Sequence, residues 1–64
     1  MEVGNRIKQI RKELKLSQYE LAKLIKSLNQ SQLSKIENGK RELKADELIQ
    51  ISKVLNIPVE KLIS

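Results

Sequence analysis

The segment that decides the fold runs from Ser17 to Gly39 and reads SQYELAKLIKSLNQSQLSKIENG. It contains two helix starts, each marked by a polar capping residue with a glutamate or glutamine three positions later. The two pairs are Ser17 with Glu20 and Asn29 with Gln32. Gly39 follows the second helix, where glycine tolerates the left-handed conformation that ends many helices. We therefore predict helices over residues 18–26 and 30–38, joined by a tight turn.

Amphipathic helices are predicted on both sides of this segment. Apolar residues recur at helical spacing over residues 3–14, with basic side chains between them. These apolar positions are Val3, Ile7, Ile10 and Leu14. A fourth helix is predicted after residue 44, because acidic residues occupy its first turn, where negative charge suits the helix dipole. The acids are Asp46 and Glu47, and the predicted buried face is Leu48, Ile51, Val54 and Leu55.

The last predicted helix is short and spans residues 58–63. Asn56 is a suitable residue to end the helix before it, and Pro58 is acceptable in a first helical turn but not in a helix interior. No segment has the pattern of a strand. The sequence therefore predicts one all-α domain of five helices over residues 1–64, with a helix-turn-helix unit at about 17–38.

Composition excludes several classes of function. The 64 residues include no Cys and no His, so a zinc finger, a disulfide scaffold, a thiol nucleophile and an imidazole base are all excluded. Neither an enzyme, a metal site nor a cofactor is expected. Tyr19 is the only aromatic residue, which argues against RNA modules that stack bases on aromatic side chains. No apolar run long enough for a membrane span or signal peptide is visible, so a cytoplasmic location is expected.

The net charge favours nucleic acid as a partner. Thirteen Lys and Arg residues against eight Asp and Glu residues give a charge of +5, and the isoelectric point is about 9.8. The exposed side chains of the second helix in the unit are hydrogen-bonding or basic types, which suit the major groove of DNA. They are Gln30, Ser31, Ser34, Lys35 and Asn38. Glu37 is the one acid of that helix, and its position beside Ile36 turns it away from this face.

Two motifs carry a family resemblance. The chain resembles the lambdoid phage repressor-like, Xre/Cro-type helix-turn-helix family in LSQYELA at 16–22 and LSKIENGKR at 33–41. The resemblance extends over nearly the whole chain, from Gly4 to Leu62. It implies a five-helix DNA-binding domain, usually dimeric on a two-fold symmetric operator, that represses or activates transcription. The connection after residue 25 is one residue longer than the family's usual turn, so either the first helix of the unit runs on or the loop bulges.

The resemblance also implies roles for individual residues. Base edges are expected to be contacted by Gln30, Ser31, Ser34 and Lys35. Phosphates are expected to be bound by Gln18, Asn38, the amide of Gly39, Lys40 and Arg41. An ion pair is expected between Arg11 and Glu37, tying the first helix to the base-contacting helix. Our candidates for a subunit contact are Val59, Leu62 and Ile63, with core packing as the alternative for each.

The expected function is sequence-specific binding of double-stranded DNA by a homodimeric transcriptional regulator, a repressor more than an activator. The chain is either a whole small regulator or the N-terminal domain of a longer one. One alternative is an antitoxin or controller protein that autoregulates its promoter and also binds a partner protein, although no partner-binding segment is visible. Another alternative is a protein-interaction module that has kept the fold without binding DNA.

Overall fold

The computed structural model describes residues 3–63, which form five α-helices. The helices are α1 (Val3–Glu13), α2 (Gln18–Leu24), α3 (Gln30–Glu37), α4 (Ala45–Leu55) and α5 (Val59–Ile63). No strand occurs among the described residues, and the predicted all-α fold of five helices is confirmed. Residues 1, 2 and 64 of the predicted domain lie outside the described residues.

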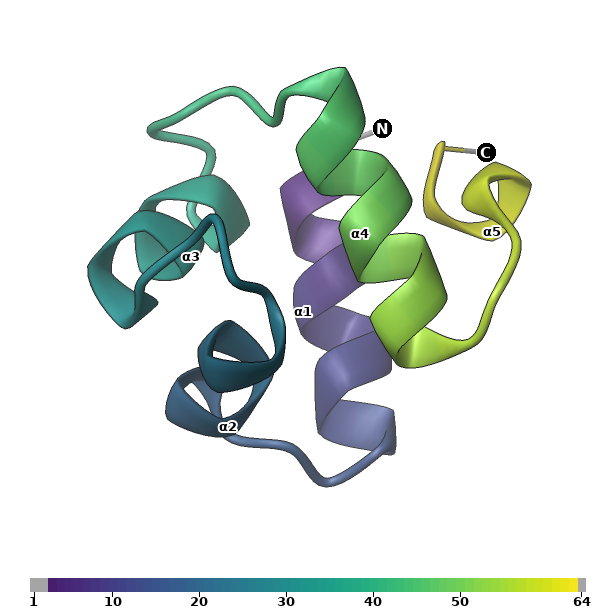
Figure 1. Ribbon diagram of the computed structural model, residues 1–64, viewed down its shortest axis with the longest axis horizontal. Helices are drawn as coiled ribbons and strands as arrows, with labels where there is room; N and C mark the ends of the chain where they lie inside the picture. The colour runs from purple at the N-terminus through teal and green to yellow at the C-terminus, as the bar shows by residue number, and fades with distance from the viewer. Residues whose placement is uncertain (1–2, 64) are drawn as a thin grey trace.

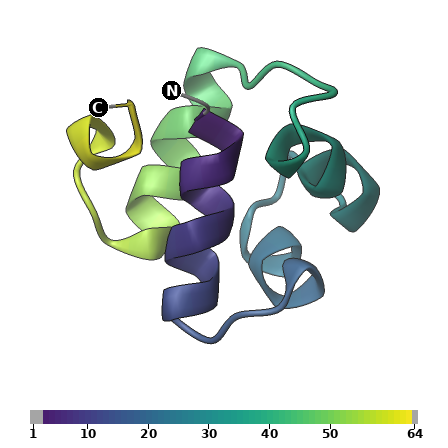
Figure 2. The same cartoon turned by 180° about the vertical axis from the view of Figure 1, so that it is seen from behind.

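The helix-turn-helix unit projects from one side of a support made by the other three helices. In Figure 1, α1 runs through the middle of the molecule behind α4, with α2 and α3 on the left and α5 on the right. The view from behind in Figure 2 has α1 in front of α4, with α5 now on the left and α2 and α3 on the right. α1 packs against both α3 and α5, so it joins the two halves of the molecule.

The core draws side chains from all five helices and from the loop between α2 and α3. Its buried apolar members are Ile7, Leu21, Ala22, Ile25, Leu28, Leu33, Ile36, Ile51, Leu55 and Leu62. Burying each Leu or Ile side chain contributes about 1.5–3 kcal/mol to stability. Leu14, expected on the apolar face of the first helix, is instead half exposed just after α1.

Both predicted capping boxes are present. The Ser17 Oγ accepts a hydrogen bond from the Glu20 amide at 3.0 Å, and the Glu20 carboxylate accepts one from the Ser17 amide at 2.8 Å. Asn29 and Gln32 exchange the same two hydrogen bonds at the start of α3, at 2.8 and 3.0 Å. A capping side chain is worth about 1 kcal/mol. The first residues of α2 and α3 are therefore fixed by local sequence, as predicted.

The end of α2 differs from the prediction. The helix stops at Leu24, two residues short of the predicted end, because Ile25 takes an extended conformation at φ −106° and ψ 103°. That conformation buries the Ile25 side chain to 1% exposure, and Leu28 is buried three residues later. Ser27 Oγ also donates a hydrogen bond to Gln50 Oε1 on α4 at 3.0 Å. The extra residue of the turn thus lies in a loop that is anchored in the core.

α1 and α3 cross in direct contact near the start of α1. A Cβ atom placed on Gly4 would lie 1.9 Å from the carbonyl oxygen of Ile36. The same oxygen accepts a hydrogen bond from the Gly39 amide at 3.1 Å, in the turn that ends α3. Only glycine permits this approach of the two backbones. The close crossing fixes the end of α3 against α1.

Candidate nucleic-acid interface

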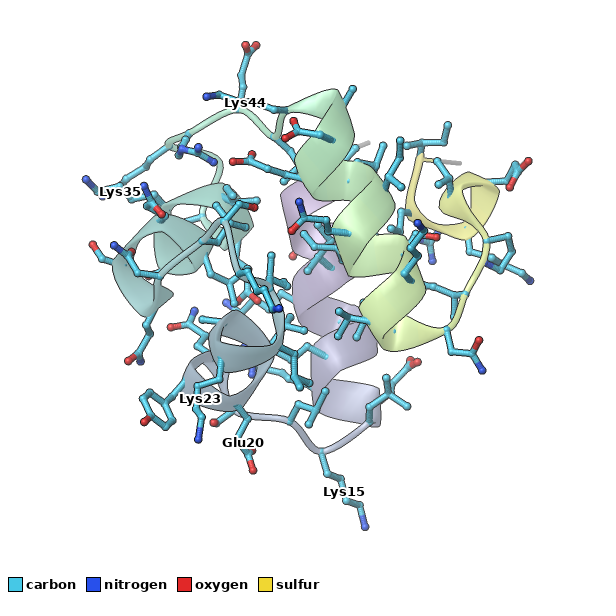
Figure 3. All side chains as sticks on the ribbon, in the orientation of Figure 1. Lys15, Glu20, Lys23, Lys35 and Lys44 are labelled. Atoms are coloured by element: carbon cyan, nitrogen blue, oxygen red, sulfur yellow. The ribbon has the colours of Figure 1, made fainter. Side chains whose placement is uncertain are left out.

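The outer face of α3 is polar and carries no exposed acid. Leu33 and Ile36 point into the core, while most of the side chains expected to contact bases lie on the opposite face. Of these, Gln30, Ser31 and Lys35 are exposed and Ser34 is half buried. Figure 3 shows Lys35 projecting from α3 away from α1. The structure therefore brings the four predicted base-contacting residues together on one accessible helix.

Glu37, the only acid of α3, is buried beneath this face. Its carboxylate accepts hydrogen bonds from Arg11 Nε at 2.8 Å and from Arg11 Nη2 at 3.1 Å. The two side chains are 8% and 0% exposed. Arg11 Nη1 also donates to the carbonyl oxygen of Leu16 at 2.7 Å. The ion pair that the resemblance implied is thus present, and it removes the negative charge of α3 from the outer surface.

Gln18 belongs to the same cluster, which the sequence did not indicate. Its Nε2 donates a hydrogen bond to Glu37 Oε1 at 3.0 Å. The carboxylate of Glu37 therefore connects α1, α2 and α3 through three hydrogen bonds. The Gln18 side chain is half buried and uses one of its two N–H groups in this contact. The second side-chain N–H group of Gln18 takes no part in this contact.

The turn after α3 presents three of the predicted phosphate-binding residues at the surface. Asn38 ends the helix, and Gly39 follows in the left-handed region at φ 74°, as predicted. Lys40 is exposed, and its amide donates to the carbonyl oxygen of Lys35 at 2.8 Å. The Gly39 amide, in contrast, already donates to Ile36. The Asn38 side chain donates one of its two N–H groups to Ser34 Oγ at 3.5 Å.

Arg41 is held by Glu47 at the start of α4. Arg41 Nη1 and Nη2 donate to the two carboxylate oxygens of Glu47 at 3.0 and 2.9 Å. Glu47 Oε1 also accepts a hydrogen bond from the Lys44 amide at 3.0 Å, which satisfies a donor at the beginning of the helix. The side chains of Arg41 and Glu47 are 24% and 5% exposed. The sequence did not indicate this pair. Arg41 was expected to bind a phosphate, and Glu47 was expected only as an acid in the first turn of a helix.

The pair shifts the protonation of both partners toward the charged forms. The hydrogen bonds from Arg41 hold the pKa of Glu47 below its usual value, against the opposing effect of burial, and the Lys44 amide adds to the lowering. The same contact raises the pKa of Arg41 above its usual value. The two side chains of Arg41 and Glu47 thus act as a structural link between the turn after α3 and the start of α4.

The three candidates for a subunit contact divide between core and surface. Leu62 is fully buried, so the contact expected of it is replaced by packing in the core. Val59 is half buried, and Ile63 is 52% exposed at the end of α5. A five-residue helix is too short for its apolar spacing to separate an inner face from an outer one.

Within residues 3–63, no group of three or more potential ligands from Cys, His, Asp and Glu is placed to hold a metal ion. None of the helices in this part of the chain is both long and apolar enough to cross a membrane.

Comparison with known proteins identifies the family. A family model described as helix-turn-helix matches residues 7–62, which includes all of α2 and α3. No curated protein and no solved structure gave a match. The match spans well over half of the chain. The matched residues include both partners of the buried Arg11–Glu37 ion pair, which lies beneath the outer face of α3. The chain belongs to the helix-turn-helix family of the Xre and lambda repressor type and is a DNA-binding regulatory domain.

Proposed function

We propose that residues 1–64 form one domain that binds a specific double-stranded DNA sequence and represses transcription from it. The observation that carries this proposal is the outer face of α3. It gathers amide, hydroxyl and ammonium groups, while the only acid of the helix is buried against Arg11. Such donors and acceptors match the edges of base pairs in the major groove, and the absence of an exposed carboxylate avoids repulsion by phosphates.

Contacts with the DNA backbone would orient α3 in the groove. Asn38 and Lys40 lie directly after α3 with their side chains at the surface, and Gln18 starts the neighbouring helix. Gln18 thus precedes the proposed base-contacting helix in the sequence, and Asn38 and Lys40 follow it. The single N–H group of Gly39 donates to Ile36, and Arg41 is held by both carboxylate oxygens of Glu47. Gln18 and Asn38 each use only one of their two side-chain N–H groups in hydrogen bonds within the protein, and Lys40 is exposed. We therefore assign the main phosphate contacts to Gln18, Asn38 and Lys40.

A homodimer would bind two half-sites about one helical turn apart on a palindromic operator. Val59 and Ile63 support this proposal, because they leave apolar surface on α5, across the molecule from α3 (Figure 1). A dimer that covers a promoter excludes other proteins from the same major grooves. Repression follows from that occupancy alone, which is why we prefer it to activation.

The test is selection of bound duplexes from a random DNA pool at about 0.15 M salt, where unspecific attraction to phosphates is already weakened. The expected product is a palindrome with half-sites about 10 base pairs apart from centre to centre. Sedimentation of the complex on that DNA should give two protein chains per duplex.

Two charge-reversal variants separate specific binding from general attraction. Lys35→Glu changes the outer face of α3, whereas Lys53→Glu makes the same charge change at an exposed position of α4. Lys35→Glu should abolish enrichment of the palindrome, and Lys53→Glu should retain it. Absence of enrichment with folded wild-type protein, or equal losses in both variants, would contradict sequence-specific binding by α3.

A further inference from the structure

The only aromatic side chain of the protein lies at the surface of α2. Tyr19 is 58% exposed, and the Nζ atom of Lys23, one turn later, lies 5.5 Å from the centre of its ring. An ammonium group at this distance from an aromatic ring is attracted to it, which restricts the otherwise mobile lysine side chain. A single exposed aromatic residue is common on protein surfaces and does not indicate a binding site. The residues around Tyr19 do carry an argument for one.

The ring borders a hollow that reaches the base-contacting helix. The hollow has a volume of about 320 Å³ and is lined by Tyr19, Ala22, Lys23, Leu28, Asn29 and Gln30. Gln30 is the first residue of α3 and one of the predicted base-contacting residues. One side of the hollow therefore belongs to α2, and the other belongs to the loop before α3 and to the start of α3, the helix proposed to contact bases. Gln30 and the Tyr19–Lys23 pair thus border the same hollow.

The lining suits the backbone of DNA. It contains no carboxylate, and its donors are one ammonium group, one phenol hydroxyl and the side-chain amides of Asn29 and Gln30, while Ala22 and Leu28 give it an apolar floor. The nearest acid along α2, Glu20, is outside the lining and is engaged by the amide of Ser17. A sugar can pack against the ring and the floor while the neighbouring phosphate accepts from Lys23. Figure 3 shows Lys23 and Lys35 both projecting outward from the side of the molecule formed by α2 and α3.

We propose that the Tyr19–Lys23 pair is an additional contact for the DNA backbone, outside the bases that α3 contacts. The Lys23 ammonium binds one phosphate, and the Tyr19 ring holds that side chain in place and packs against the adjoining deoxyribose. This inference rests on the proposed function. It adds a second contact between α2 and the DNA backbone to the phosphate contacts proposed for Gln18 and for the turn after α3.

The test uses the operator obtained by selection and measures affinity at a series of salt concentrations. For each phosphate contact that is lost, the plot of log affinity against log salt becomes less steep by about one. Lys23→Ala should show this change and weaken binding to operator and unrelated DNA by the same factor. Tyr19→Leu should weaken binding with a smaller change in slope, and Lys23→Arg should restore the slope. The matched control is Lys26→Ala, an exposed lysine in the next loop that does not line the hollow.

Ethylation of single phosphates locates the contact. Modification of one phosphate outside the bases contacted by α3 should impair binding of the wild type but not of Lys23→Ala. An unchanged slope and an unchanged ethylation pattern in Lys23→Ala, or the same changes in Lys26→Ala, would overturn this inference and leave the proposed function intact. Failure of the wild type to bind any duplex would overturn both. Thermal unfolding of each variant confirms that the fold is retained.

Discussion

Arg11 and Glu37 are separated by 26 residues, yet they form a buried ion pair with a distance of 2.8 Å between Nε and Oε2. Arg11 lies in α1, which is packed between the two halves of the molecule, and Glu37 is the last residue of α3. The pair connects α1 to the helix that carries the proposed base-contacting side chains. Gln18 adds α2 to the same carboxylate. One buried carboxylate thus links both helices of the helix-turn-helix unit to α1.

Loss of one partner of this pair should cost more stability than loss of both. Arg11→Met leaves the Glu37 carboxylate buried without its cation, which costs about 3–5 kcal/mol. A domain of this size has only about 3–10 kcal/mol of total stability. The double variant Arg11→Met with Glu37→Leu should be more stable than either single variant, because an apolar pair needs no partner. Urea unfolding measures all three free energies.

The matched control for this cycle is Lys12→Met, which removes an exposed cation from the neighbouring position of α1. A surface change of this kind should alter stability by no more than about 0.5 kcal/mol. Strictly additive effects of the two single changes would show that the pair does not act as a unit.

Gly4→Ala should destabilise the protein although alanine favours helices. Helix propensity alone would raise stability by about 0.5–1 kcal/mol. The added Cβ would lie 1.9 Å from the Ile36 oxygen, so α1 and α3 must move apart. Such overpacking costs about 1–3 kcal/mol. Urea unfolding measures whether the free energy of unfolding falls, as the clash predicts, or rises, as helix propensity alone would predict. Asn5→Ala is the control, because Asn5 is the next residue of α1 and its side chain is exposed.

The Arg41–Glu47 pair should make stability depend on pH in the acidic range. The pKa of Glu47 is lowered in the folded state, chiefly by the hydrogen bonds from Arg41, so its contribution is fully present above the unfolded value of about 4.3. It is lost as the pH falls through the lower pKa of the folded state. The stability gap between wild type and Glu47→Gln should therefore shrink from about pH 5 downward. A gap that stays constant down to about pH 3 would contradict the role of the ion pair.

Unfolding free energies at a series of pH values provide this measurement. Glu42→Gln is the matched control, because it removes one carboxylate from the exposed part of the same loop. Its comparison with Glu47→Gln separates the effect of the bidentate contact from the general effect of one fewer negative charge.

Local interactions made much of the fold predictable. The starts of α2 and α3 depend on hydrogen bonds between residues three positions apart, and such pairs are visible in the sequence. The left-handed turns at Gly39 and Asn56 are equally local. The end of α2 was not predictable in this way. Ile25 leaves the helix because its side chain is buried in a core formed by distant segments, and only the three-dimensional structure contains that information.

The candidate site follows the same division. The polar face of α3 could be predicted because the spacing of Leu33 and Ile36 defines its opposite, buried face. The Arg11–Glu37 pair came from the resemblance, since neither charge is marked by its neighbours. The contact of Gln18 with Glu37 was missed because it joins two helices, and the contact of Arg41 with Glu47 was missed because it depends on the path of the loop between α3 and α4. Contacts between separate segments of the chain therefore required the structure.

Lys35→Ala and Lys40→Ala should weaken DNA binding in different ways. Lys35 lies on the outer face of α3, so its removal should relax preference at one base position by about 1–3 kcal/mol. Lys40 follows the helix and is assigned to a phosphate, so its loss should weaken all sequences alike and reduce the salt slope by about one. Affinities for the selected operator and for single-base variants of it, each measured over a range of salt, separate the two effects. Identical losses across sequences in both variants would refute the division between base and phosphate contacts, because a lysine that contacts a base cannot be indifferent to which base is present.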